Sequence, residues 1–205
     1  MTIRFVLASA SPARYRTLAR AGVVAEVLVS GVDESQSIAA SPAQLAQILA
    51  EAKADAVAGT VRGPALVLGC DSLLELDGLA LGKPESVDAA IGRWRQMRGK
   101  RGVLHTGHAL IDVASGRRQS RTVSTVVRFA DITDDEIAAY CSSGEPSSVA
   151  GGFTIDGLGG WFVDGLEGDP HNVVGLSLPA LRRMLADLDY ELADIGYPAA
   201  SGTAT

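Results

Sequence analysis

The sequence is short of several features, and each shortage excludes a class of protein. Only two cysteines occur in the 205 residues, Cys70 and Cys141, and their separation matches no metal-binding spacing, so we expect a reduced, cytoplasmic compartment. Apolar runs stay well short of the roughly 20 residues of a membrane-spanning helix, and the run after Arg4 is too short for a signal peptide. Basic residues are outnumbered, 18 against 24 acidic ones, which gives a net charge of −6. We therefore expect neither membrane insertion nor general nucleic-acid binding, since the latter depends on neutralising phosphates.

Common catalytic and nucleotide-binding motifs are missing as well. No Walker loop and no G-x-S-x-G elbow occurs, and the glycines of residues 151–160 lack the spacing of a dinucleotide fingerprint. His105 and His108 lie three positions apart in a predicted strand, so their rings would point to opposite faces and could not share one metal ion. His171, in a turn predicted at residues 169–172, is assigned no role.

The composition that remains is globular, with 47% hydrophobic and 20% charged residues, and strand and helix patterns alternate, which predicts an α/β fold. Strands are predicted at residues 3–8, 27–29, 65–69, 103–113, 122–129 and 161–163, and helices at 12–21, 42–58, 86–99, 133–140 and 178–188. A tight hairpin is predicted at Asp77-Gly78. No linker or repeat divides the chain, so we expect one domain over residues 1–190 and a flexible tail over residues 191–205.

The junction between the first strand and the first helix suits a phosphate group. Ser11 can cap the helix and Pro12 fits its first turn, which leaves backbone N–H groups at the N-terminus. The helix dipole and these donors attract an anion, the Ser9 and Ser11 hydroxyls lie beside it, and Arg14 can hold two oxygens at once. The alternative is an ordinary capped helix with a surface arginine.

Two acidic residues follow predicted strands. Asp71 comes directly after a buried strand, with Ser72 beside it as a candidate phosphate contact; functional residues of open α/β sheets lie at this position. The Asp71 carboxylate could ligate Mg²⁺ or accept a proton from water. Glu34, in a loop after another short predicted strand, would complete an oxygen pair for a hard cation. The alternatives are a turn-capping Asp71 and a solvated Glu34.

Two lysines are candidates for contacts with phosphate. Lys83 lies between Gly82, whose backbone is permissive, and Pro84, whose backbone is restricted. These neighbours can hold the lysine in place to reach a phosphate. Lys53 borders the apolar face of the second predicted helix. The alternatives are a turn lysine at position 83 and, at position 53, a side chain that extends its amine into solvent.

In this order the segments resemble the Maf family of nucleoside triphosphate pyrophosphatases. The resemblance extends from Leu7 to about Leu185 and rests on short motifs that are weak singly and strong jointly. They are Leu7-Ala8-Ser9-Ala10-Ser11-Pro12 with Arg14, Glu51-Ala52-Lys53-Ala54, Gly69-Cys70-Asp71-Ser72, Leu81-Gly82-Lys83-Pro84, Thr106-Gly107, Ala150-Gly151-Gly152-Phe153, Gly157-Leu158-Gly159 and Val174-Gly175-Leu176.

The resemblance implies an elongated, mixed α/β sheet flanked by helices, related to the inosine-triphosphate pyrophosphatases, with two lobes around a cleft. It implies a homodimer that hydrolyses a nucleoside triphosphate to the monophosphate and pyrophosphate with Mg²⁺ or Mn²⁺. Asp71 would be the proton acceptor and a metal ligand, and Glu34 a metal or water ligand. The phosphate contacts carried over by motif are Ser9, Ser11, Arg14, Lys53 and Lys83.

The sequence departs from the family pattern at two positions. Many relatives have two arginines after Ser-Pro, and here Ala13 replaces the first. Members that resemble dTTP and UTP hydrolases often have Gln where this chain has Asp156. An acid at that position, like the segment 167–170, resembles the branch that handles 7-methyl-GTP, since a carboxylate accepts hydrogen bonds from base N–H groups. Asp156 is therefore a candidate substrate contact, and the base preference stays open between 7-methyl-GTP and dTTP or UTP.

An alternative function uses the same site without hydrolysis. The chain could be a nucleotide sensor that regulates cell division through a protein partner. The acidic residues distinguish the two hypotheses, because a site that only binds anions gains nothing from carboxylates near phosphate unless a metal ion intervenes.

Overall fold

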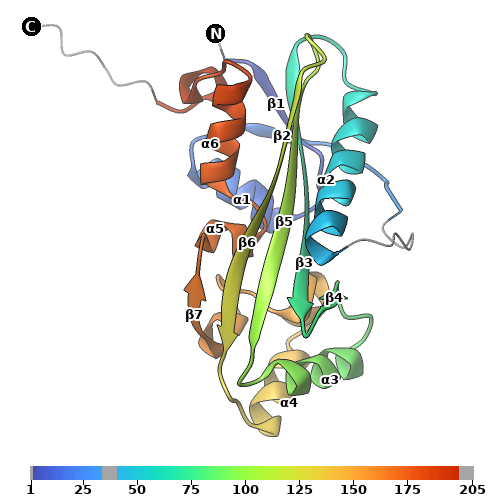
Figure 1. Ribbon diagram of the computed structural model, residues 1–205, viewed down its shortest axis with the longest axis vertical. Helices are drawn as coiled ribbons and strands as arrows, with labels where there is room; N and C mark the ends of the chain where they lie inside the picture. The colour runs from blue at the N-terminus through green and yellow to red at the C-terminus, as the bar shows by residue number, and fades with distance from the viewer. Residues whose placement is uncertain (1, 34–40, 199–205) are drawn as a thin grey trace, which may run out of the picture.

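The sheet forms the long axis of the molecule. A computed structural model describes residues 2–33 and 41–198, and it shows an elongated mixed sheet with helices on both faces (Figure 1). The strands are β1 (Arg4–Leu7), β2 (Ala25–Val27), β3 (Ala65–Leu76), β4 (Leu79–Leu81), β5 (Arg101–Asp112), β6 (Arg118–Phe129) and β7 (Val163–Glu167). Their order is β2-β1-β3-β5-β6-β7, and β4 pairs with β3. The predicted mixed α/β sheet is confirmed.

Helices begin where the sequence places their caps. The α-helices are α1 (Pro12–Arg20), α2 (Pro42–Ala58), α3 (Val87–Met97), α4 (Asp134–Ser142), α5 (Pro170–Val174) and α6 (Leu178–Asp187). The described residues also form the 3-10 helices η1 (Glu145–Ser148), η2 (Ala150–Gly152), η3 (Leu158–Phe162) and η4 (Leu192–Ile195). The capping boxes predicted at Ser41 and Thr133 are both present. Within the described residues, the search for a helix with the length and apolar character of a bilayer span finds none.

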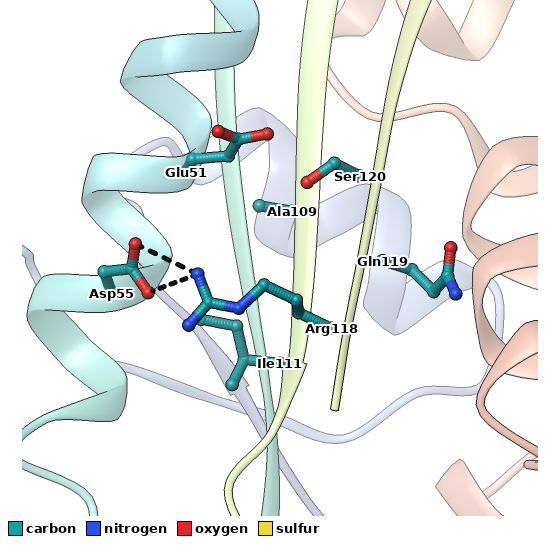
Figure 2. A pocket seen from close by; sticks show the side chains of 7 residues that line it. All are labelled: Glu51, Asp55, Ala109, Ile111, Arg118, Gln119 and Ser120. Carbon is teal, nitrogen blue, oxygen red and sulfur yellow. Dashed lines mark hydrogen bonds and ion pairs between the residues drawn. The ribbon is translucent and has the colours of Figure 1, made fainter. Parts of the chain in front are cut away.

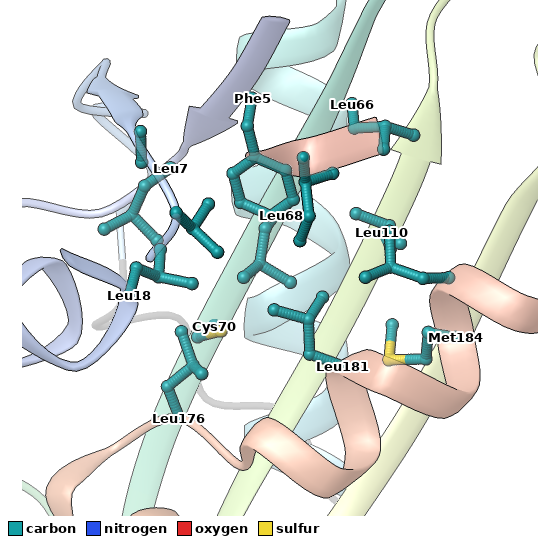
Figure 3. Packing of buried hydrophobic residues seen from close by; sticks show 14 of the residues in the cluster. Phe5, Leu7, Leu18, Leu66, Leu68, Cys70, Leu110, Leu176, Leu181 and Met184 are labelled. Atoms are coloured by element: carbon teal, nitrogen blue, oxygen red, sulfur yellow. The ribbon is translucent and has the colours of Figure 1, made fainter. Parts of the chain in front are cut away.

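Two apolar clusters lie along one face of the sheet. The first core packs α1 and α6 against β1, β3 and β5, and Figure 3 shows Leu68 and Leu110 meeting Leu181 there. The second core surrounds the fully buried Trp94 of α3 at the other end of the sheet. Between the cores on this face lie buried polar side chains, Thr106 of β5 and Asn172 of α5. Buried polar side chains thus separate the two apolar cores on this face.

The opposite face is covered by α2, which approaches the sheet at two glycines. A Cβ atom on Gly69 of β3 would lie 2.2 Å from the Ala50 carbonyl oxygen, and one on Gly107 of β5 would lie 2.3 Å from that of Ala46. Both contacts are with helix backbone, which cannot move aside as a flexible side chain would. The glycines therefore set how closely α2, and Lys53 on it, approaches the sheet.

One edge of β3 has a break in its pairing. Along that edge β1 pairs in parallel with Ala65–Leu68, and β4 pairs antiparallel with Leu74–Leu76. Within the described part of the chain, residues 69–73 have no strand partner there. Because β1 is parallel to β3 and β4 is antiparallel to it, the carboxyl ends of β1 and β4 both point toward this stretch. The segments after both strands are thereby directed to the same part of β3, which includes Asp71.

Several predicted boundaries are corrected. The strand predicted to end at Gly69 continues to Leu76, because β5 pairs with it from Leu66 to Glu75. Asp71 therefore lies within a strand and not after one, although it does lie beyond the end of β1. The strand predicted at residues 27–29 occupies Ala25–Val27, and the one predicted at residues 161–163 starts only at Val163.

Two segments expected to lack regular structure are folded. The turn predicted at residues 169–172 begins helix α5, with Asp169 as its cap. The predicted tail contains η4, and its Ile195 is buried in the first core. Residues 191–198 thus belong to the folded body, because Ile195 and the backbone bond from Ile3 N to Asp194 O attach them to it. The two-lobed arrangement stays a prediction.

Candidate active site

The junction between β1 and α1 folds as predicted and holds an arginine inside the protein. The Ser11 hydroxyl accepts a hydrogen bond from the Arg14 backbone N–H at 3.4 Å and so caps α1. The Ser9 hydroxyl accepts the Ser11 backbone N–H at 3.3 Å, which shapes the turn. Arg14 is only 8% exposed, so the alternative of a surface arginine is wrong.

Arg14 reaches across the molecule to three acceptors. Its Nη1 donates to Ser9 Oγ at 2.9 Å and its Nη2 to Ser72 Oγ at 3.0 Å. Its Nε donates to the carbonyl oxygen of Gly175 at 2.8 Å, in the connection between α5 and α6. The guanidinium is thus fixed by segments from three distant parts of the chain, and two of its acceptors are predicted phosphate-binding residues, Ser9 and Ser72.

Lys53 and Asp71 form a buried ion pair. Lys53 Nζ lies 2.5 Å from Asp71 Oδ1, and both residues are 6% exposed. The alternative in which Lys53 extends into solvent is therefore wrong. Removing two charges from water is costly, and in a buried ion pair the attraction between the two charges offsets part of that cost. The Lys53 ammonium and the Asp71 carboxylate thus lie in direct contact inside the protein.

Arg14 with its hydroxyl acceptors Ser9 and Ser72, here called the Arg14 group, and the Lys53–Asp71 pair approach β3 from opposite faces. Successive strand residues alternate, so Asp71 faces α2, whereas Cys70 and Ser72 face α1 and α5. Burial raises the pKa of the Cys70 thiol to about 11, and the charges of Arg14, Asp71 and Lys53 all act on it. These charged groups therefore surround one short stretch of β3, and its unpaired edge is the place where both faces meet.

Two predicted site residues whose position is described lie outside this cluster. Lys83 is exposed in the segment after β4, which leads toward residues 69–73 of β3. Asp156 is exposed, and its Oδ2 lies 3.9 Å from Arg16 Nη2 on α1. Glu34 lies outside the described residues. The structure thus brings Ser9, Arg14 and Ser72 into direct contact and Lys53 with Asp71, and places Lys83 and Asp156 at the periphery.

A chain of buried polar contacts that the sequence does not reveal supports the Arg14 group. Ser72 Oγ lies 2.9 Å from Thr106 Oγ1, which donates to the Asn172 carbonyl oxygen at 3.0 Å. The Asn172 amide in turn donates to the Leu104 carbonyl oxygen at 3.1 Å. Only the Thr106-Gly107 dipeptide gave a sequence signal, and it came from the family resemblance.

His108 fixes the connection that carries the Gly175 carbonyl. Its Nε2 accepts the backbone N–H of Ser177 at 2.9 Å, so the proton is on Nδ1, which faces the Arg121 carbonyl oxygen at 3.2 Å. Ser177 Oγ donates to Asp169 Oδ2 at 2.5 Å. The neutral imidazole thereby orders the segment that holds Arg14.

Acid is expected to destabilise the protein through His108. Burial lowers the pKa of His108 from 6.5 to about 4, so between these values the unfolded chain binds the proton and the folded one resists it. The full stability present above pH 6.5 should fall by about 3 kcal/mol as the pH drops to 4. Urea unfolding at pH 7, 5.5 and 4 measures this. His108→Gln should lose about 3 kcal/mol less than the parent over that range; equal losses would contradict the assignment.

The hollow drawn in Figure 2 is separate from these groups. It lies between α2 and the strands β5 and β6, and Asp55 closes it by an ion pair with Arg118 at 3.2 Å. None of its lining residues, Glu51, Asp55, Ala109, Ile111, Arg118, Gln119 and Ser120, is a predicted site residue. We therefore place the site at β3 and not in this hollow.

A metal ion would find one carboxylate in the described part of the site. Across the described residues no three His, Cys, Asp or Glu side chains converge on a common point. Mg²⁺ is commonly held by one or two carboxylates together with substrate phosphates, so Asp71 fits an ion that arrives with a polyphosphate. Glu34 is the second predicted ligand.

Comparison with known sequences identifies the family. The family model described as Maf-like protein matches residues 4–188. The chain belongs to the Maf family. The resemblance predicted from the short motifs is thus confirmed over nearly the whole Maf domain.

Close relatives cover nearly the whole chain. A nucleoside triphosphate pyrophosphatase of Streptomyces coelicolor is 59% identical over 198 residues, which is 96% of each chain. A protein of the same name from Salinispora tropica is 54% identical and covers 95% of this chain and 88% of its own. Among solved structures, the Ham1 protein of Staphylococcus aureus is 17% identical, with a TM-score of 0.43 over 62% of this chain and 72% of that one.

Proposed function

We propose that this Maf protein is a nucleoside triphosphate pyrophosphatase that releases a nucleoside monophosphate and pyrophosphate. The observation that carries the proposal is the buried Lys53–Asp71 pair beside the Arg14 group, at the unpaired edge of β3. A carboxylate on the same short stretch of strand as the residue that binds Arg14 suits a reaction in which water attacks a phosphate. The relatives named above carry the name of this activity.

Each group has an assigned task in the reaction. Arg14 and the N-terminus of α1, together with Lys83, bind the triphosphate oxygens and neutralise their charge. Asp71 accepts the proton of a water molecule, the water oxygen bonds to the α-phosphorus, and the bond to the leaving pyrophosphate breaks in line. The Lys53 ammonium pairs with the Asp71 carboxylate before Asp71 accepts the proton. After the transfer, the same ammonium interacts with the phosphate oxygens.

Mg²⁺ or Mn²⁺ is the proposed cofactor, held by Asp71 and Glu34 with the substrate. When bound, such an ion neutralises phosphate charge and orients the leaving group. At the other end of the substrate, Asp156 is the proposed base contact. A carboxylate favours the adjacent N1–H and N2–H donors of a guanine such as 7-methyl-guanine over the pyrimidines of dTTP and UTP, whose single N3–H lies between two carbonyl oxygens. A cytoplasmic homodimer completes the proposal.

Chelation is expected to stop the reaction. With excess EDTA, pyrophosphate release from 7-methyl-GTP, GTP, dTTP and UTP should fall at least about a hundredfold, because phosphate charge is no longer neutralised. Mg²⁺ or Mn²⁺ should restore it, and 7-methyl-GTP should be the preferred substrate. Coupled pyrophosphate assays measure the rates.

Two outcomes would contradict the proposal. If turnover is unchanged in EDTA, the reaction does not need a metal ion and the proposed cofactor is wrong. Tight binding of a triphosphate in calorimetry, without metal and without product, would instead favour the sensor of cell division. The calorimetry needs a matched nucleoside monophosphate as control, because only the triphosphate engages Arg14 and Lys83 together.

A further inference from the structure

Glu145, at the start of η1, is a half-buried acid at the centre of the turn formed by residues 154–160. Its Oε1 accepts hydrogen bonds from Thr154 Oγ1 at 2.7 Å and from the Gly159 backbone N–H at 2.9 Å. Its Oε2 accepts the Leu158 backbone N–H at 3.0 Å. Tyr140 Oη on α4 donates to Oε1 at 2.8 Å. One carboxylate therefore joins both ends of this turn to helix α4.

The turn leaves no room for anything larger around this carboxylate. A Cβ atom on Gly157 would lie 2.4 Å from Glu145 Oε2, and one on Gly159 would lie 2.5 Å from Tyr140 Oη. Burial acts to raise the pKa of Glu145, but the hydrogen bonds from Thr154, Gly159 and Leu158 outweigh it and lower the pKa. The acid is charged at neutral pH, and its charge matches four converging donors.

The outer side of the turn presents Asp156 to helix α1. Asp156 is exposed, and it meets Arg16 at 3.9 Å. Arg16 lies on the same helix whose N-terminus carries Ser11 and Arg14. The position of Asp156 relative to the phosphate-binding end of α1 is therefore set by a turn whose inner side is held by Glu145.

We propose that Glu145 is a positioning residue for base discrimination, which acts by holding the 154–160 turn so that Asp156 stands beside α1. This inference rests on the proposed function, in which Asp156 contacts the base. Glu145 itself touches no substrate. A Gln in its place has the same shape but directs an NH₂ group at backbone N–H donors, so the turn loses the arrangement that the charged acid imposes.

The test compares Glu145→Gln with the parent enzyme on 7-methyl-GTP, GTP, dTTP and UTP. We expect KM for the preferred nucleotide to rise about tenfold, kcat to stay within about twofold, and the ratio of kcat/KM between preferred and poorest nucleotides to fall at least about fivefold. Glu136→Gln is the matched control. Glu136 is also a hydrogen-bonded acid, at the cap of α4, and it does not contact the turn.

A double-substitution cycle identifies the route of the effect. If Glu145 acts through Asp156, then Glu145→Gln should change base discrimination no further in a protein that already carries Asp156→Ala. Unchanged KM and discrimination in folded Glu145→Gln, with only kcat lowered, would show a merely structural role and overturn the inference. If Glu145→Gln does not fold, Thr154→Val removes a single donor, and the same comparison decides.

The failure of this inference is distinguishable from that of the proposed function. If Asp156→Ala alone changes discrimination and Glu145→Gln does not, only the positioning role is wrong. If Asp156→Ala leaves discrimination unchanged, the assignment of Asp156 to the base is wrong, and the inference falls with it. Neither result bears on Asp71, whose substitution tests hydrolysis itself.

Discussion

Asp71→Asn is expected to reduce pyrophosphate release about a thousandfold, the largest loss of any single substitution at the site. An amide cannot accept the proton of the attacking water, and the substitution removes the negative charge that lies 2.5 Å from the buried Lys53 ammonium. Steady-state assays with saturating nucleotide and metal ion measure kcat. Because the variant also loses a buried ion pair, its thermal midpoint must be recorded with its activity.

Asp112→Asn is the matched control. Asp112 is an equally buried aspartate, 6% exposed, but its carboxylate accepts hydrogen bonds in the turn after β5, from Ala114 and Ser115. It should keep its turnover within about twofold, since it contacts no group of the site. If folded Asp71→Asn kept half of the parental turnover, Asp71 would not be the base.

Gly69→Ala adds a methyl group on β3 directly against the backbone of α2, and it should strongly destabilise the protein. The new Cβ would lie 2.2 Å from Ala50 O and 2.7 Å from Ala54 N, so the helix must move away from the sheet. We expect a loss of about 3 kcal/mol in unfolding free energy, or a thermal midpoint lower by roughly 10 °C. Activity of the folded fraction should also fall, because the movement separates Lys53 from Asp71.

Gly92→Ala adds the same methyl group where a Cβ meets nothing within 4 Å. Gly92 lies inside α3, so alanine should leave stability unchanged or raise it by up to about 1 kcal/mol. Urea titration of both variants measures the difference. Equal stability of Gly69→Ala and the parent would show that α2 does not rest on the sheet at this glycine.

Local chemistry predicted much of the fold. Ser41 with Gln44 and Thr133 with Glu136 marked helix starts, because a capping box is complete within four residues. The hairpin was predicted from the Asp77-Gly78 pair, since these residue types tolerate the positive φ that both adopt in the structure. The end of β3 was missed because a polar Asp71 looks like the end of a buried strand, whereas pairing with β5 continues the strand to Leu76.

The candidate site was predicted in part, for a related reason. The sequence indicated three charged candidates from their neighbouring residues: Arg14, Lys53 and Asp71. Their roles in hydrolysis stay predictions. The acceptor that fixes Arg14, Gly175 O, is 161 residues away, and a backbone carbonyl has no sequence signature. Glu145 was overlooked because its partners include Gly159 and Leu158 N–H groups, which any residue other than proline would supply.

The long strands β3 and β5 limit how the enzyme can close on a substrate. Both run without interruption from the first core to the second, hydrogen-bonded to each other over ten residue pairs. A hinge between the two ends would have to bend or break this ladder, which is far costlier than rearranging a loop. Nucleotide binding is therefore expected to involve movement of short connecting segments, while the sheet beneath them stays rigid.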